Sequence, residues 1–317
     1  MIIPWREAWQ EALYGSGGFY RRPEGPVGHF ETATHGPVGR ALARTLVGLA
    51  AETGAEGVVD LGAGRGELLS ALRSVGFAGP LAGVDVVDRP AGLPAETGWV
   101  VAPGGDRLAE PATVADALGT DLGRALVVAH EWLDVVPCTV AQVDDDGALR
   151  EVEVDDAGAE RLGAAVTGDA LGWAQRWWPT DEPGARVEIG LARDDAWAAV
   201  LDAWHPLRAV AIDYGHTAGT RPPSGTLAAY RDGEVVLPVP DGSADLTAHV
   251  ALDSLRHDEI VSGAEAVRRW GPSVRLPDHA LSRSDPAGYL AALADVSAAR
   301  TLLGEPYGRF AWVIARG

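Results

Sequence analysis

Hydrophobic residues change their spacing along the chain, and each spacing predicts a kind of element. Short, nearly continuous apolar runs are typical of buried strands, and they occur at 57–61, 81–87, 125–130, 209–213 and 310–315. Apolar residues at helical spacing occur at 4–14, 39–51, 67–74 and 113–118. Because strands alternate with helices between 57 and 130, the sequence predicts an α/β fold around a parallel sheet.

A different pattern begins at Cys138. Residues 139–143 and 149–154 alternate apolar with polar side chains on either side of a turn at 144–147, which predicts a β-hairpin. A helical, tryptophan-rich stretch follows, and its aromatic rings suit either core packing or the lining of a substrate cleft. These residues are Trp173, Trp177, Trp178, Trp197 and Trp204.

Charge narrows the possible partners. The 317 residues carry a net charge of −19, which disfavours nucleic acid and anionic membranes because both require a basic surface. A cationic substrate or a basic protein partner is compatible with this charge, and so is a merely solvated acidic surface. All 26 basic residues are arginine, so any mechanism with a catalytic lysine is excluded.

Cysteine content and hydropathy bear on disulfides, metal sites and the cellular compartment. Cys138 is the only cysteine, so no intrachain disulfide and no cysteine-based zinc site can form, and we expect no metal. The first residues lack the apolar stretch of a signal peptide, and no apolar run approaches the roughly 20 residues that span a bilayer. We therefore expect a soluble, cytoplasmic protein.

A glycine-rich turn joins a predicted strand to a predicted helix between Asp60 and Glu67. Its glycines, Gly62, Gly64 and Gly66, allow the backbone to approach a ligand closely. Dinucleotide sites space their glycines G-x-G-x-x-G and place a pyrophosphate on the helix N-terminus. Here the third glycine comes one position early, and Glu67 would repel a pyrophosphate. S-Adenosylmethionine has no phosphate and carries a positive sulfonium, so the sequence predicts a site for that cofactor.

Two aspartates extend this prediction. Asp85 ends the second strand, 19 residues after Gly66, where an acid can accept hydrogen bonds from ribose hydroxyls. Asp60 ends the first strand and can hold the methionine end of the cofactor. The alternative interpretation is a structural turn between strand and helix with an aspartate at the surface.

An acidic segment, His130 to Pro137, follows the predicted strand at 125–130. Its polar side chains should therefore lie at the carboxyl edge of the sheet, where ligands bind in open α/β folds. Glu131 and Asp134 share a face if this turn is helical, and the pair could orient a guanidinium and take its proton. A helix N-cap and a solvated acid are the alternative.

Later segments add candidates for substrate binding. Asp213 ends the next apolar strand and should face the same cleft, where His130 also belongs. Tyr230 and His249 are further candidates, although a single histidine is more often structural than catalytic. Thr32 falls within a possible cofactor lid at 30–35.

Six motifs occur in one order along the chain and together resemble the MidA-like family of S-adenosylmethionine-dependent methyltransferases. They are His29 to Thr32, Asp60 to Gly66, His130 to Pro137, Ile212 to Gly215, Gly225 to Arg231 and Asp245 to Val250. The resemblance implies a Rossmann-like seven-stranded methyltransferase core, S-adenosylmethionine as cofactor, and a protein arginine side chain as acceptor. The family usually has Asn-Glu where this chain has His130-Glu131.

The patterns and the resemblance divide the chain into four regions. These are an N-terminal helical segment with the cofactor lid at 1–45, the cofactor-binding half of the core at 46–138, a hairpin and helical insertion at 139–205, and the rest of the core with substrate-side loops at 206–317. The leading hypothesis is a methyltransferase acting on a protein arginine. A non-catalytic assembly factor that binds a partner protein and a small-molecule methyltransferase are alternatives, and an oxidoreductase that uses a nicotinamide cofactor is a more distant one.

Overall fold

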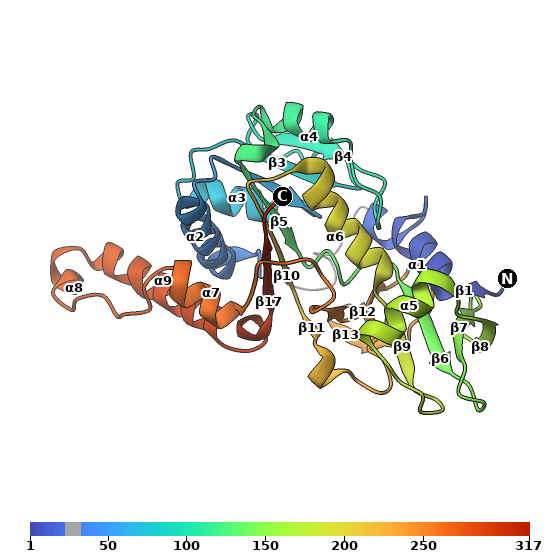
Figure 1. The fold of residues 1–317 in the computed structure, drawn as a ribbon. Coiled ribbons are helices and arrows are strands. Elements are labelled where there is room, and N and C mark those ends of the chain that lie inside the picture. The colour runs from blue at the N-terminus through green and yellow to red at the C-terminus, as the bar shows by residue number, and fades with distance from the viewer. Residues whose placement is uncertain (23–32) are drawn as a thin grey trace.

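The computed structural model describes residues 1–22 and 33–317, and a seven-stranded sheet forms its centre (Figure 1). The strand order is β16, β17, β10, β5, β2, β3, β4. Neighbours from β10 to β4 are parallel, whereas β17 is antiparallel to both β10 and β16. The bounds are Gly57–Leu61 (β2), Leu81–Asp85 (β3), Gly98–Val101 (β4), Ala125–His130 (β5), Arg208–Asp213 (β10), Glu259–Ser262 (β16) and Ala311–Ala315 (β17).

Helices cover both faces of this sheet, which is why its inner strands are apolar along their whole length. One face packs against α4 (Pro111–Leu118) and α6 (Leu191–Trp204). The other face packs against α2, α3, α7 and the C-terminal half of α9. The bounds of these four are Gly36–Thr53 (α2), Glu67–Ser74 (α3), Gly263–Trp270 (α7) and Pro286–Leu303 (α9). The predicted α/β fold with a parallel sheet is confirmed.

A second sheet lies beside the core and contains the predicted hairpin. Its strands run in the order β1, β7, β6, β9, and β8 also pairs with β7. The bounds are Ile3–Pro4 (β1), Thr139–Val143 (β6), Leu149–Val154 (β7), Glu160–Ala165 (β8) and Arg186–Ile189 (β9). Helices α1 (Trp5–Tyr14) and α5 (Gly168–Trp177) contact this sheet. Helix α1 therefore folds with the insertion, whereas α2, which begins in the predicted N-terminal segment, and α6, at the end of the predicted insertion, pack on the core.

The tryptophans of the predicted helical stretch pack in the hydrophobic core. Trp197 and Trp204 lie between α6 and the central sheet, and Trp173 and Trp178 pack against β6 and β9. None of these four lines the main cavity described below. Of the two interpretations of this stretch, core packing is the one that the structure supports.

Two small sheets lie between the core and the insertion. Strands β11 (Gly215–His216) and β15 (Val250–Ala251) are parallel. A three-stranded antiparallel sheet has the order β13, β12, β14, with bounds Ala228–Arg231 (β12), Glu234–Val236 (β13) and Asp245–Thr247 (β14). One side of this sheet packs on α1, because the indole of Trp9 donates to the carbonyl of Leu246 at 2.9 Å.

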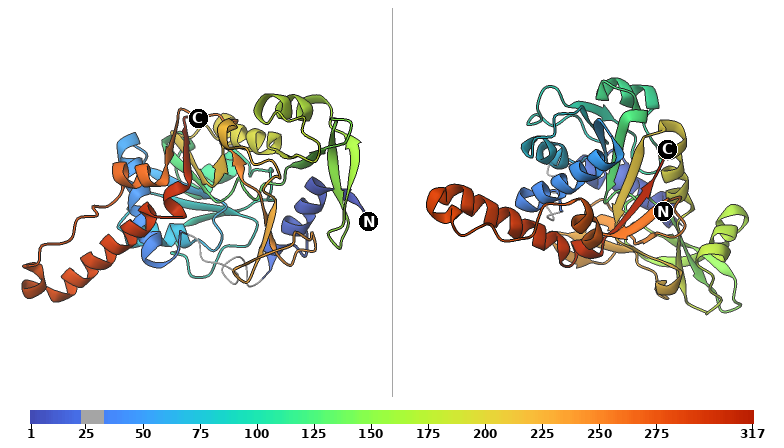
Figure 2. Two further views of the ribbon diagram at one scale, coloured as in Figure 1. Left: turned by 90° about the horizontal axis from the view of Figure 1, so that it is seen from below. Right: turned by 60° about the vertical axis from the view of Figure 1, so that its left-hand side comes forward.

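A helical arm projects from the core (Figures 1 and 2). It consists of α8 (Leu281–Ser284) and the N-terminal half of α9, and it extends to the side opposite the insertion. Only the second half of α9 contributes buried residues, from Val296 onward. Within the described ranges, no helix has the length and apolar character needed to cross a membrane.

Trp197 anchors α6 to the central sheet, and its side chain is fully buried. Replacing it by alanine removes this contact and leaves a cavity, so Trp197→Ala should lower the free energy of unfolding by about 3–5 kcal/mol. Urea denaturation monitored by circular dichroism measures the change. Trp177→Ala, at a partly exposed position on α5, is the matched control and should cost much less; equal losses would contradict the burial argument.

Candidate active site

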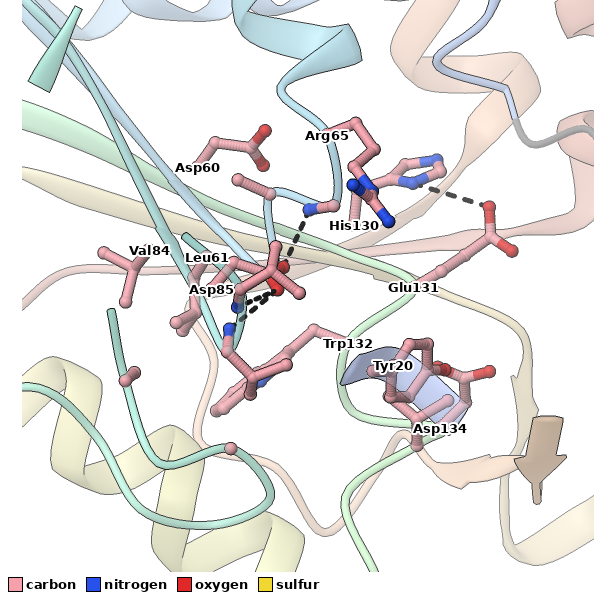
Figure 3. A pocket seen from close by; sticks show the side chains of 18 of the residues that line it. Tyr20, Asp60, Leu61, Arg65, Val84, Asp85, His130, Glu131, Trp132 and Asp134 are labelled. Carbon is pink, nitrogen blue, oxygen red and sulfur yellow. Dashed lines mark hydrogen bonds and ion pairs between the residues drawn. The ribbon is translucent and has the colours of Figure 1, made fainter. Parts of the chain in front are cut away.

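A cavity of about 320 Å³ opens at the carboxyl ends of β2, β3 and β5. It is lined by residues of the glycine loop (62–66), of the loop after β3 and of the turn at 131–136 after β5, which we call the elbow. Residues of α1, η1 (Phe19–Arg21), β12 and β14 complete the lining. Figure 3 shows Asp60 and Asp85 on one side of this space, and Glu131, Asp134 and Tyr20 on the other. The cavity therefore has two sides, which we call the glycine-loop side and the elbow side.

Gly62 and Gly64 shape the wall on the glycine-loop side. Their φ angles are 78° and 57°, in the left-handed region that side chains other than glycine rarely adopt. A Cβ atom on Gly62 would lie 3.1 Å from the ring of Trp132. Gly66 does not line the cavity; it begins α3, where a Cβ atom would lie 2.6 Å from Leu93. The predicted cofactor contact at Gly66 is therefore replaced by close packing against Leu93, in the loop after β3.

Every amide of this loop already has an acceptor within the protein. The N–H groups of Gly62 and Ala63 donate to the carbonyl of Val84, at 2.9 and 3.2 Å, and that of Gly66 donates to Ala63 at 2.7 Å. The remaining two donate to carboxylates, Gly64 to Asp85 at 2.7 Å and Arg65 to Glu67 at 2.9 Å. These five amides therefore offer no free donor to a pyrophosphate, and two carboxylates lie beside them, so the loop suits a ligand without phosphate.

Asp85 is held in place by three amides. Its Oδ1 accepts from Val86 at 2.7 Å and from Val87 at 3.3 Å, and its Oδ2 accepts from Gly64 alone. The single donor on Oδ2 leaves capacity for a ribose hydroxyl on the cavity side. Burial raises the pKa of Asp85 to about 6, although the amide hydrogen bonds favour the carboxylate.

Asp60 lines the same side of the cavity from the end of β2 and is only 3% exposed. Burial, and then the charges of Glu67 and Asp85, raise the pKa of Asp60 to about 8. Three carboxyl groups thus surround the glycine loop. A cationic ligand would relieve their mutual repulsion, which fits the ammonium and sulfonium groups of S-adenosylmethionine.

The elbow after β5 is not helical. Glu131 has a φ angle of 50°, and residues 131–136 form bends and turns. The condition under which Glu131 and Asp134 would share a helix face is therefore not met. Both side chains nevertheless line the cavity, because the left-handed residue turns the chain sharply at the edge of the sheet.

Asp213 supports the elbow from behind instead of facing the cleft. Its Oδ2 accepts from the amides of Leu133 at 3.1 Å and Asp134 at 3.2 Å, and Oδ1 accepts from Tyr214 at 3.0 Å. The side chain is 1% exposed and is absent from the cavity lining. The prediction that Asp213 faces the cleft is corrected: its acceptor capacity is used by backbone amides.

A buried arginine holds the other side of the elbow. Arg193, on α6, donates to the carbonyls of Val136 and Asp134, at 3.0 and 2.7 Å. It also donates to Ala248 and His249, each at 3.0 Å. The pattern of the sequence gave no sign of this residue, because its partners are carbonyl oxygens that any residue carries.

Two carboxyl oxygens on the elbow side have no hydrogen-bond partner among residues 1–22 and 33–317. Oε1 of Glu131 and Oδ1 of Asp134 are buried, and the other oxygen of Asp134 accepts from the hydroxyl of Tyr214. Burial, followed by the charges of Asp134 and Asp245, raises the pKa of Glu131 to about 8. Such orphan oxygens are costly unless a ligand donates to them.

His130 lies between the two sides of the cavity. Its Nδ1 is 3.4 Å from Oε1 of Glu131, and burial lowers the pKa of the imidazole to about 4. The ring is therefore neutral at pH 7 and does not supply a positive charge to the carboxyl of Glu131. His130 lines the cavity, in agreement with its predicted place in the cleft.

The remaining candidates for substrate binding differ in whether they line the cavity. Tyr230 lines the cavity, whereas His249 is exposed and absent from the lining; its ring contacts Tyr214, with centroids 5.1 Å apart. Thr32 lies outside the described residues. The lining residues that the local sequence pattern missed include Tyr14, Tyr20, Asp245 and Thr247. Across 1–22 and 33–317, no group of histidine, cysteine or acidic side chains is arranged to hold a metal ion.

The strand order, the closed glycine loop and the acid at the end of β3 define the class: an S-adenosylmethionine-dependent methyltransferase. Comparison with known families gives the same result, because residues 38–268 match the family described as "Putative S-adenosyl-L-methionine-dependent methyltransferase". The chain belongs to this family, and the predicted cofactor is confirmed with it.

Two solved structures from Burkholderia thailandensis share the fold. An uncharacterised protein has a TM-score of 0.70 and 23% identity, covering 100% of this chain and 87% of the other. A member of the same superfamily, bound to S-adenosyl-homocysteine, has a TM-score of 0.69 and 22% identity, covering 100% and 88%. No curated protein matches the chain.

Asp85→Asn should weaken the binding of S-adenosylhomocysteine by roughly ten- to a hundredfold, because the carboxylate accepts from ribose hydroxyls and an amide does so less well. For the wild type, the dissociation constant should rise as the pH falls through about 6, since protonation removes the acceptor. Calorimetry between pH 5 and 8 measures both. Equal affinity of the two proteins across this range would exclude the role of Asp85.

Proposed function

We propose that the chain transfers the methyl group of S-adenosylmethionine to an arginine side chain of a protein. One observation carries this proposal: the elbow side of the cavity holds several buried carboxyl groups that form no ion pair with an arginine in the part of the chain that the structure describes. Among described residues, Glu131, Asp134 and Asp245 form no ion pair with arginine. A guanidinium entering this space would supply the missing positive charge and the missing donors.

The chemistry requires little more than position. When bound, the cofactor supplies an electrophilic methyl group on a sulfonium. The side chains of Glu131 and Asp134 can then orient the planar guanidinium, whose five N–H donors match paired carboxylate oxygens. Glu131 is the group that can take the proton released on methylation, because its raised pKa places it near neutrality.

Aromatic side chains complete the acceptor site. Tyr14, Tyr20, Tyr214 and Tyr230 line the cavity, and the hydroxyl of Tyr20 donates to Asp245 at 2.7 Å. Such rings stack on a guanidinium and exclude water from it. The bound S-adenosyl-homocysteine of the Burkholderia protein supports placing the cofactor in the corresponding fold position.

Glu131→Gln should lower kcat by roughly 100-fold or more, because it removes the proton acceptor from the site. Binding of S-adenosylhomocysteine should stay unchanged, since the glycine-loop side is intact. Asp134→Asn should mainly raise KM for the acceptor. The assay follows tritium from labelled cofactor into proteins of a cell lysate, with methylarginine identified after acid hydrolysis.

Glu182→Gln, at an exposed glutamate in the loop before β9, is the matched control and should behave as wild type. Label found only in small molecules would contradict a protein acceptor. Label in protein at residues other than arginine would contradict the guanidinium assignment while leaving the methyltransferase class intact.

A further inference from the structure

We propose that strand β13 is a docking edge for an extended segment of the substrate protein, which places the methylated residue in the cavity. This inference rests on the proposed function, because it concerns how a polypeptide acceptor reaches the elbow side. It is carried by the two faces and the open edge of the sheet formed by β13, β12 and β14.

The two faces of this sheet differ in what they contact. Ala229 and Leu246 are buried against α1 and the insertion, and Val236 packs partly against the same cluster. Tyr230 and Asp245 are paired across β12 and β14, and both line the cavity. Residues directly opposite in an antiparallel pair project on the same face, so one face is core and the other belongs to the cavity.

The cavity face continues outward onto β13. Val235 pairs with Tyr230, so its side chain projects on the same face as the tyrosine ring. Exposure rises across the sheet, from 4% at Asp245 to 69% at Val235 and 84% at Leu237, just after the strand. These two are among the most exposed large apolar residues of the described chain, and they lie beside an acidic cavity.

The edge of β13 also carries backbone N–H and C=O groups that an added strand could hydrogen-bond. Asp232 and Gly233 have φ angles of 53° and 79°, which make a two-residue hairpin turn closed by the hydrogen-bonded pair Arg231 and Glu234. The next pair, Tyr230 and Val235, is then the non-hydrogen-bonded kind. The N–H and C=O of Val235 therefore point away from β12, toward the open side of the sheet.

In the described part of the chain, β13 pairs with β12 alone, and no hydrogen bond to either backbone group of Val235 is found. An unpaired edge with apolar side chains is the surface on which an extended peptide adds as a further strand. The neighbouring carboxyl groups select among such peptides, because a cationic residue nearby is attracted and an acidic one is repelled.

The spacing of strands sets a further requirement. A strand added to β13 would lie three spacings from β14 and Asp245, roughly 14 Å at about 4.8 Å each. An extended chain advances about 3.3 Å per residue. The docked residues should therefore be separated from the methylated arginine by about four residues.

The test uses two synthetic peptides. The first carries a block of three valine or threonine residues about four residues from its only arginine, made in both orders; the second replaces the block by glycine and serine. Wild-type protein should methylate the first with a KM roughly five- to tenfold lower, the value expected for one or two additional net hydrogen bonds and modest apolar contact.

Val235→Pro removes the N–H that points to the open edge but leaves the hydrogen bonds between β12 and β13, and proline is tolerated at such edges. Val235→Pro and Leu237→Asp should each raise KM for the first peptide toward that of the second, with kcat and the affinity for S-adenosylhomocysteine unchanged. Leu290→Asp, 65% exposed on the distant arm, is the matched control and should change nothing.

The outcomes separate this inference from the proposed function. If both peptides are methylated with the same KM, or if Val235→Pro and Leu237→Asp match Leu290→Asp, the docking edge is wrong and the arginine acceptor stands. If neither peptide is methylated or bound, as measured by fluorescence anisotropy, both proposals fail. If the two variants instead change the sedimentation of the protein alone, the edge serves self-association and the peptide role is overturned.

Discussion

The elbow after β5 depends on two buried side chains, Asp213 and Arg193, which both hydrogen-bond to its backbone. Asp213 accepts amides from one side of the elbow, and Arg193 donates to its carbonyls from the other. Each group satisfies backbone atoms that would otherwise be buried without partners. With these polar groups satisfied, Oε1 of Glu131 and Oδ1 of Asp134 have no hydrogen-bond partner among the described residues and are available to a ligand.

Two amides of the glycine loop are also satisfied by side chains, but both of these side chains are carboxylates. There the carboxylates of Asp85 and Glu67 accept the loop amides, so that the backbone is closed before any ligand arrives. Carboxyl groups thereby gather on both sides of one cavity, and burial raises the pKa of Asp60 and of Glu131 to about 8. The site is organised for ligands that bring positive charge, which a methyl-donating sulfonium and a guanidinium both do.

Local patterns in the sequence predicted those features of the fold and of the site that depend on residues close together in the chain. The strands β2, β3 and β5, the turn around Gly64 and the places of Asp60 and Asp85 follow from apolar runs and glycine spacing. Asp213 could not be assigned in this way, because a strand-terminal aspartate looks the same whether it faces a ligand or a backbone. Tyr20 and Asp245 meet across 225 positions, and nothing local indicates that pairing. Strand β9 was missed because four residues between two helices carry too little periodicity.

The closed amides of the glycine loop have a consequence for competition inside a cell. Many abundant metabolites share the adenosine half of the cofactor but carry a chain of phosphates, and a loop with open amides would attract all of them. Here the five loop amides already have acceptors, two of which are carboxylates, so the loop backbone has no donor to offer a phosphate. Selectivity against phosphate-bearing adenosine compounds is therefore expected from the hydrogen bonding of the loop backbone itself.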